Sequence, residues 1–162
     1  ELFVTYQGGD GNDIELYTQS FLGVRPESLR DPRLIGSDAD DSLTETSADE
    51  VIFGVSGDDV LLGGSGDDHV TGANGNDRLD GGSGDDKLKG DRGADTYTLS
   101  RGDDVIIGFS VAENDRISVA DGVELSLTQA GDDLLLTADG IHTTLLDVDK
   151  VEFLAADVVD FI

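Results

Sequence analysis

The sequence of 162 residues contains no cysteine, two prolines, two histidines and only ten basic residues, and 6% of its residues are aromatic. Without cysteine, the redox compartment cannot be inferred from disulfides. No apolar run approaches the ~18 residues of a transmembrane helix, so we expect no membrane-spanning segment. No signal peptide is recognisable at the N-terminus, where the chain begins in a strand-like run, and we interpret it as a piece of a longer protein.

The scarcity of basic residues leaves an extreme negative charge, because 36 acidic residues give a formal net charge of -26. A chain with so much self-repulsion and so little apolar surface lies near the disordered class when no cation is bound. We therefore expect cations to be part of the fold. The same charge argues against nucleic-acid binding, which needs basic patches to meet phosphate. It also disfavours anionic membrane surfaces unless calcium bridges the two.

Residues 36–107 form eight consecutive nine-residue units with no insertion or deletion, of which GGSGDDHVT and GGSGDDKLK are typical. The sixth place is always acidic: Asp41, Glu50, Asp59, Asp68, Asp77, Asp86, Asp95 and Asp104. The eighth place is always apolar or aromatic: Leu43, Ile52, Leu61, Val70, Leu79, Leu88, Tyr97 and Ile106. A fixed period of this kind indicates a solenoid, and G-G-x-G-x-D-x-U-x is typical of a calcium-binding parallel β-roll.

The chemistry of one unit explains this pattern. Glycines at the first, second and fourth places permit turns with positive φ and bring carbonyl oxygens close together. The last three places then form a short strand whose middle side chain points inward. Two units make one coil, so each unit stacks on the unit two places later and the sixth-place residues form two columns. Paired carboxylates and several carbonyls supply the 6–8 oxygen ligands that suit calcium better than zinc.

These positions give the candidate metal ligands. They are Asp41, Gly57, Asp59, Gly64, Gly66, Asp68, Gly75, Asp77, Gly82, Gly84, Asp86, Gly93, Asp95, Gly102 and Asp104. The alternative is that Asp and Gly merely form solvated turns, but turn composition alone does not keep the sixth place acidic and the eighth apolar. The first two units are weaker, because Ala39 and Ala48 replace the fourth glycine and Glu50 is longer than Asp.

The segments outside the repeat complete an all-β fold. Residues 1–18 predict a β-hairpin, interpreted as the end of a preceding domain, and the alternative that its turn at 8–13 also holds calcium stays open. Residues 19–35 contain both prolines and predict a linker or N-terminal cap. Residues 36–107 are the calcium-binding β-roll. Residues 108–162 show alternating apolar runs, including Val151–Leu154, and predict an antiparallel β-meander that caps the last coil.

Units three to eight, followed by Asn114-Asp115-Arg116-Ile117-Ser118-Val119, resemble the repeats-in-toxin (RTX) family of haemolysin-type calcium-binding proteins. The resemblance implies export by a bacterial type I secretion system that reads an uncleaved C-terminal signal, and Asp160-Phe161-Ile162 is similar to the acidic and apolar terminus of several members. The stretch 6–14 resembles strand ends of large bacterial surface proteins, which favours an adhesin or surface-layer parent over a toxin.

Two functional hypotheses follow. The first is a calcium-dependent folding and secretion module of an exported bacterial surface protein, which is unfolded at low cytosolic calcium. The alternative is a calcium-stabilised module that binds polysaccharide or a cell surface through basic side chains of the later units: Arg78, Lys87, Lys89, Arg92 and Arg101. We expect no enzyme, because the sequence has no H-E-x-x-H motif and no G-x-S-x-G elbow.

Overall fold

The computed structural model describes residues 2–6, 14–18, 33–44 and 47–162. Strands β1 (Leu2–Tyr6) and β2 (Ile14–Thr18) pair antiparallel. The turn at 8–13, and residues 19–32 of the expected linker or cap, lie outside the described residues. The expected cap ends in a strand, β3 (Arg33–Ile35), which belongs to the roll.

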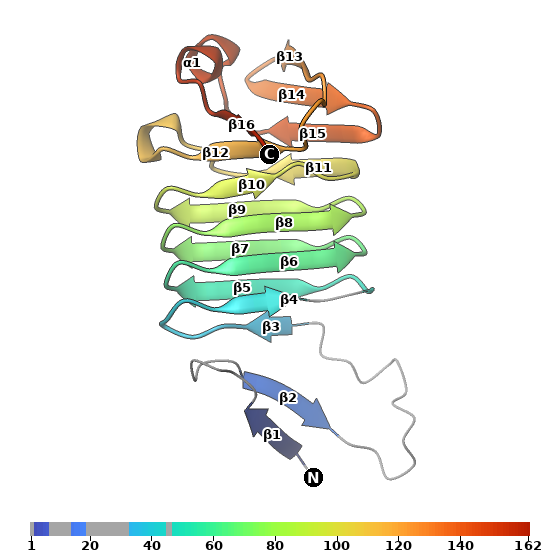
Figure 1. Cartoon of the computed structure of the whole chain (residues 1–162), viewed down its shortest axis with the longest axis vertical. Helices are drawn as coiled ribbons and strands as arrows, with labels where there is room; N and C mark the ends of the chain where they lie inside the picture. Colours follow the sequence, from blue (N-terminus) through green and yellow to red (C-terminus); the bar gives the residue numbers. More distant parts are fainter. Residues whose placement is uncertain (1, 7–13, 19–32, 45–46) are drawn as a thin grey trace.

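Residues 33–44 and 47–119 build a flattened coil of two parallel sheets, seen from the side in Figure 1. One sheet contains β4 (Ser42–Thr44), β6 (Val60–Ser65), β8 (Arg78–Ser83), β10 (Thr96–Thr98) and β12 (Arg116–Val119). The other contains β3, β5 (Val51–Ser56), β7 (His69–Asn74), β9 (Lys87–Arg92) and β11 (Gly102–Ile106). Leu61 pairs in register with Leu79, 18 residues later, so two units make one coil. The predicted parallel β-roll is confirmed.

The core of the roll is the eighth-place column. Every eighth-place side chain from Leu43 to Ile106 is buried, and most are fully inaccessible. The strands are longer than the three residues expected, because β6 to β9 continue through the first three places of the next unit. The first-place glycines are therefore buried beside the eighth-place side chains, which makes the interior narrow.

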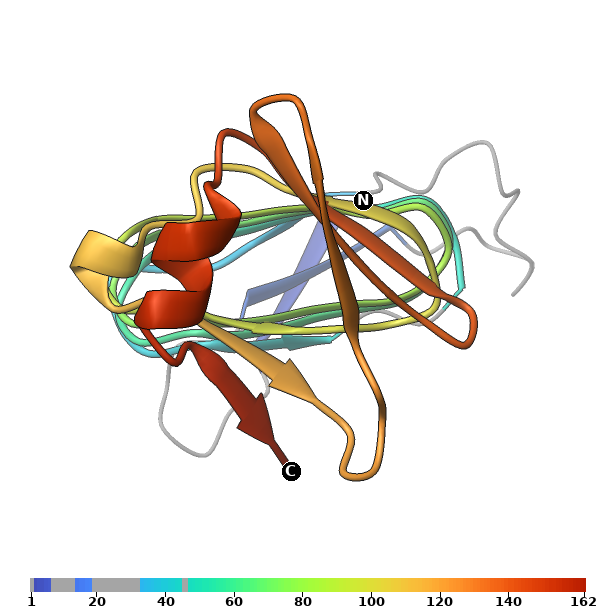
Figure 2. The ribbon, with the colours of Figure 1, turned by 90° about the horizontal axis from the view of Figure 1, so that it is seen from above.

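The C-terminal segment differs from the meander predicted for residues 108–162. Only β13 (Ser126–Ala130), β14 (Asp133–Ala138) and β15 (Ile141–Leu145) pair antiparallel. Strand β15 joins β11 in parallel, while β12 and β16 (Val159–Phe161) extend the other sheet in parallel. The predicted strand at Val151–Leu154 is wrong, because these residues lie in helix α1 (Lys150–Ala155). Figure 2 shows α1 and the tilted meander strands lying across the end of the roll.

The short helix forms because its N-terminus is capped. The Asp149 side chain accepts hydrogen bonds from the backbone N–H groups of Val151 and Glu152, which satisfies donors that have no partner within the helix. Phe153 is the buried residue of α1, and its ring centroid lies 5.7 Å from that of Phe109. The Asp149 cap and the burial of Phe153 thus stabilise a helix where the alternating apolar pattern predicts a strand. None of the helices in the described part of the chain is long and apolar enough to span a membrane.

Candidate calcium sites

The sixth-place residues form two buried columns, one on each edge of the roll, which we call the inner carboxylates. Each column member is at most 6% exposed. Each Asp from Asp59 to Asp104 accepts through Oδ1 a backbone N–H from the sixth-place residue one coil earlier. These hydrogen bonds are 2.8–3.1 Å long. The columns therefore hold successive coils in register, as well as bringing carboxylates together.

The second oxygen of the inner carboxylates is the unusual feature of the site. In Asp59, Asp68, Asp77, Asp86 and Asp95, Oδ2 is buried and has no hydrogen-bond partner among the described residues. Each Oδ2 lies against the first-place glycine of its own unit, where a Cβ atom would overlap with it. A buried charged oxygen without a donor is costly, and native structures compensate it with a hydrogen bond, an opposite charge or a metal. These five oxygens therefore fit a cation.

Burial also changes the protonation of these side chains. Desolvation raises the pKa of Asp59, Asp86 and Asp95 to about 6, and neighbouring carboxylates in the same column add to the effect. The pKa values of Asp77, Asp104 and Asp115 are raised for the same main reason. The roll thus holds its carboxylates in an environment that penalises negative charge. A positive ion in the column would relieve that penalty.

The predicted glycine ligands lie in the turns beside the inner carboxylates. Fourth-place glycines adopt φ of +112° to +142°, and Gly64 and Gly82 at the second place adopt +100° and +97°. A Cβ atom on Gly75 would overlap with the carbonyl oxygen of Gly57, and Gly84, Gly93 and Gly102 face the same obstacle one coil earlier. Only glycine allows this close stacking of turns. Coordination by these carbonyl oxygens remains a prediction.

In the described part of the chain, no three His, Asp or Glu side chains are grouped as a metal-ligand cluster. Carboxylates alone would therefore supply too few ligands for calcium, which takes 6–8 oxygens. The backbone carbonyls of the turns are the remaining oxygen donors beside the columns. This donor set contains no sulfur and no imidazole, so it suits a hard cation.

A serine hydroxyl donates to the carboxylate at one end of each column. Asp41 Oδ2 accepts from the backbone N–H of Ser37 at 2.5 Å and from its hydroxyl at 3.0 Å. Asp104 Oδ2 accepts from the Ser100 hydroxyl at 3.2 Å. The predicted ligand Asp104 therefore has protein donors on both oxygens. Asp41 keeps one buried oxygen, Oδ1, without a partner in the described chain.

Asp115 is a column member that the sequence analysis missed. It is 2% exposed, and its Oδ1 accepts from the N–H of Asp95, 20 residues earlier. Its Oδ2 accepts from the N–H of Ser110 at 2.8 Å. The signal was present in the sequence, since Ile117 follows Asp115 as an eighth place follows a sixth. The two residues inserted after Ile107 hid it.

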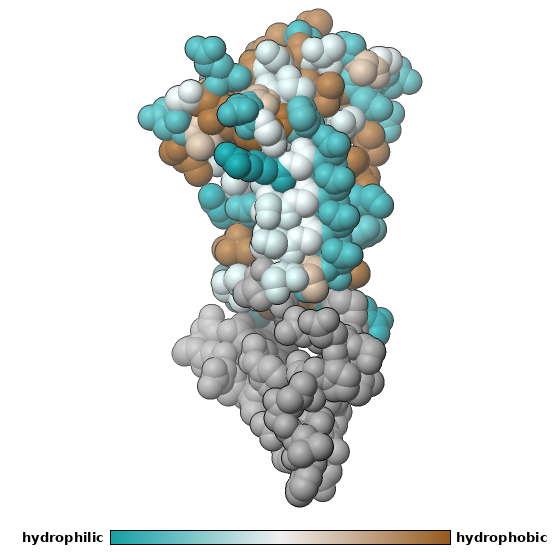
Figure 3. Space-filling model, turned by 90° about the vertical axis from the view of Figure 1, so that its right-hand side faces the viewer, coloured by the Kyte–Doolittle hydropathy of each residue, from teal (hydrophilic) through white to brown (hydrophobic). Residues whose placement is uncertain are grey.

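The fifth-place residues were also missed. We call the six aspartates among them the outer carboxylates: Asp40 and Asp58 on one edge, where Asn76 continues the column, and Asp49, Asp67, Asp85 and Asp103 on the other. All seven are exposed, and each of the six that precede Asp103 accepts the N–H of the residue 18 places later at 2.7–3.0 Å. Figure 3 faces the second edge, where a hydrophilic column runs along the turns.

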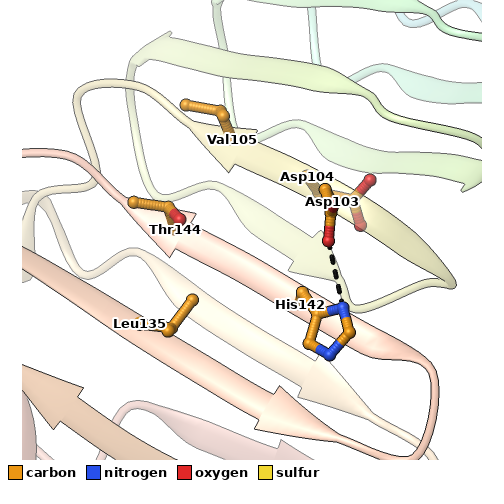
Figure 4. A pocket seen from close by; sticks show the side chains of 6 residues that line it. All are labelled: Asp103, Asp104, Val105, Leu135, His142 and Thr144. Atoms are coloured by element: carbon orange, nitrogen blue, oxygen red, sulfur yellow. Dashed lines mark ion pairs between the residues drawn. The ribbon is translucent and has the colours of Figure 1, made fainter.

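One surface hollow lies where the meander meets the roll (Figure 4). It measures about 460 Å³ and is lined by Asp103, Asp104, Val105, Leu135, His142 and Thr144. His142 Nδ1 lies 3.0 Å from Asp103 Oδ1, and these side chains are 55% and 76% exposed. The ion pair joins β15 to the last coil. An exposed ion pair of this kind contributes little to stability.

Comparison with known proteins supports the calcium interpretation of the repeats. The family model described as RTX calcium-binding nonapeptide repeat matches residues 46–79 and 71–106. A comparison with curated proteins gives no significant match.

Several solved structures are similar to this chain. The solution structure of the AlgE6R3 subunit of the Azotobacter vinelandii mannuronan C5-epimerase is 31% identical, with a TM-score of 0.44 over 77% of this chain and 80% of that one. The AlgE6R2 subunit of the same enzyme is 26% identical, with a TM-score of 0.42 over 83% and 96%. The extracellular lipase LipA of Serratia marcescens is 18% identical, with a TM-score of 0.43 over 78% and 39%.

Proposed function

We propose that this chain, whose residues 46–106 are RTX calcium-binding nonapeptide repeats, is a calcium-dependent folding and secretion module of an exported bacterial surface protein. The observation that carries the proposal is the set of five buried Oδ2 atoms without a partner in the described residues. The calcium-free roll has to desolvate these charges without compensation. The calcium-bound roll does not, so calcium binding supplies free energy of folding.

Each of the five inner carboxylates with an unpaired Oδ2 has two tasks in this mechanism. Its Oδ1 accepts the N–H of the preceding coil and sets the register. Its Oδ2 faces the space beside a first-place glycine, where a bound cation supplies the opposite charge. We expect one ion for each unpaired Oδ2, hence about five ions, with Asp104 and Asp115 serving as column ends.

Calcium concentration then decides where the chain folds. Extracellular calcium modules bind at ~10⁻⁴–10⁻³ M, far above free calcium inside a cell. The chain therefore stays unfolded and can be threaded through a secretion channel before export, and it folds outside. The proposal extends to the type I secretion machinery, an adhesin-type parent at the cell surface, and Asp160–Ile162 as part of the export signal.

The export step has a direct test. Cells that secrete the chain through a type I system are compared with millimolar calcium and with chelator outside, and the rate of export is measured. Folding at the exit should hinder back-sliding, so we expect faster export with calcium outside. Equal rates would remove the secretion part of the proposal and leave calcium-driven folding intact.

The alternative, a module that binds polysaccharide or a surface, needs a continuous basic strip. The structure separates the basic residues, because Arg78 lies on β8 of one sheet and Lys87 and Lys89 lie on β9 of the other. Lys89 also pairs with Asp91 at 2.5 Å. This arrangement favours the folding module over the binding module. A glycan array with calcium present distinguishes them.

The folding proposal is tested by titrating calcium into metal-free protein and following strand content by circular dichroism, with magnesium as a control. Ion stoichiometry is measured by calorimetry on the wild type, on Asp86→Asn and on Asp85→Asn. The two substitutions remove the same charge from adjacent residues, but only Asp86 has a buried Oδ2 without a partner among the described residues, whereas Asp85 is exposed. We expect Asp86→Asn to lose an ion and Asp85→Asn to keep the full number. A wild-type chain that is fully folded without metal would refute the proposal.

A further inference from the structure

The outer carboxylates make hydrogen bonds that do not need a negative charge. Asp67 Oδ1 accepts the N–H of Asp85 at 2.9 Å, and Asn76 Oδ1 accepts the N–H of Ala94 at the same distance. Asn76 also donates from Nδ2 to Asp58 Oδ1 at 3.1 Å, which a carboxylate cannot do. An amide at this place therefore supplies every folded-state contact of the carboxylate and one more.

Charge is what the carboxylate adds to this position. On the second edge, Asp49, Asp67, Asp85 and Asp103 occupy successive coils, so neighbouring charges are about one inter-strand spacing, ~4.8 Å, apart. They also act on the inner carboxylates, because Asp67 raises the pKa of Asp86 and Asp85 raises that of Asp104. Like charges at this spacing destabilise the metal-free roll.

A bound cation reverses the effect of the same charges. Calcium beside the inner carboxylates carries two positive charges, so the exposed carboxylates one residue away become attractive partners at short range. An outer carboxylate thus destabilises the metal-free roll and does not destabilise the calcium-bound roll. Its net effect is a larger difference in stability between the two states.

We propose that the charge of the outer carboxylates, and not their hydrogen bonding, sets how strongly folding depends on calcium. The inference rests on the proposed calcium-driven folding. It states that exposed residues outside the ion sites suppress folding of the metal-free chain. The break in the first edge at Asn76 and Ala94 leaves the second edge, with four consecutive carboxylates, as the main contributor.

The test compares wild type with Asp67→Asn/Asp85→Asn in the full chain. The matched control is Asp121→Asn/Asp132→Asn, which removes the same charge from exposed turns of the C-terminal segment. Metal-free protein in chelator at pH 7.5 is folded by adding trimethylamine N-oxide, which favours compact states. The folding equilibrium constant is measured by circular dichroism, and the thermal midpoint is measured separately at saturating calcium.

We expect the metal-free folding constant of Asp67→Asn/Asp85→Asn to rise about tenfold, or ~1.4 kcal/mol. The control should shift it by less than about twofold, since the charges that it removes lie on exposed turns outside the stacked columns and are screened by salt. The calcium-saturated thermal midpoint should not rise. The reverse substitution Asn76→Asp should lower the metal-free constant, because it adds a charge beside Asp58 and removes a donor.

Three results would overturn the inference: an unchanged metal-free constant, an equal gain in the control, or an equal gain in the calcium-bound state. The last result would mean that the substitution stabilises the fold in general. These failures are distinct from failure of the proposed function, which shows itself in the wild type. If the wild type needs calcium to fold and the variant needs it to the same extent, only the role of the outer carboxylates is refuted.

Discussion

Acidification should partly replace calcium as the trigger for folding. In the metal-free roll, burial raises the pKa of Asp59, Asp86 and Asp95 from 3.8 to about 6. Since the folded state binds protons more tightly than the unfolded state, the metal-free fold is stabilised as pH falls through 6 toward 4. The same linkage makes it least stable above pH 6, where all three groups are charged and buried.

The magnitude follows from the pKa values. Between pH 7 and pH 5, a carboxyl with a folded pKa of about 6 and an unfolded pKa of 3.8 stabilises the fold by about 1.3 kcal/mol. Three such groups give about 4 kcal/mol, a large share of the 5–15 kcal/mol by which domains are usually stable. The shift is therefore large enough to be seen as a gain in folded fraction.

The assay is circular dichroism of calcium-depleted protein from pH 7.5 to pH 5, above the sequence pI of about 4.1. We expect strand signal to grow as pH falls. The triple substitution Asp59→Asn/Asp86→Asn/Asp95→Asn should fold more readily at pH 7.5 without metal and lose most of the pH dependence. With calcium present the sign reverses, because protons compete with the ion. A metal-free folded fraction that is constant or falls toward pH 5 would refute the reasoning.

Three further predictions, one of them with a control substitution, test the backbone and the core, each by chemical denaturation at saturating calcium. Gly75→Ala should cost about 3 kcal/mol or more, because φ is +141° and the new Cβ would overlap a carbonyl of the preceding coil, whereas Gly131→Ala, with open space around it, should cost only about 1 kcal/mol. Val55→Gly should stabilise by about 1 kcal/mol, because a β-branched residue is strained at φ +90°; a loss of stability would contradict this. Tyr97→Phe should cost about 1–3 kcal/mol, since the phenol oxygen accepts the buried N–H of Gly90 at 2.9 Å, and an unchanged denaturation midpoint would argue against that bond.

The nine-residue period was sufficient to predict the roll because the residues that specify each coil lie close together in the sequence. Each unit carries its own turn glycines, its own acidic residue and its own inward side chain, so the stacking interval of 18 residues follows from pairing alternate units. The period was insufficient for strand length. The third place of a unit, such as Ser65, continues the strand only because Ser83 offers a partner in the next coil.

The C-terminal segment was predicted less well because its apolar pattern is compatible with either a strand or a helix. Val151 to Leu154 alternates like a strand, yet Asp149 caps a helix there and Phe153 packs on Phe109. Strand β16 likewise joins the roll in parallel, where Arg116 forms an ion pair with Asp160 that lowers the pKa of Asp160. Such contacts join residues more than 40 positions apart, and no local pattern encodes them.

The sequence by itself determined the two columns of inner carboxylates and the oxygen chemistry of the sites, because regular spacing places like residues above one another in a solenoid. Only the tertiary structure decided which oxygens need an ion. Asp86 and Asp104 occupy the same place in their units. The Ser100 hydroxyl donates to Oδ2 of Asp104, whereas Oδ2 of Asp86 is buried without a hydrogen-bond partner among the described residues. In both Asp41 and Asp104 the donor is a serine four residues earlier in the same unit, and only the folded turn shows that its hydroxyl reaches Oδ2.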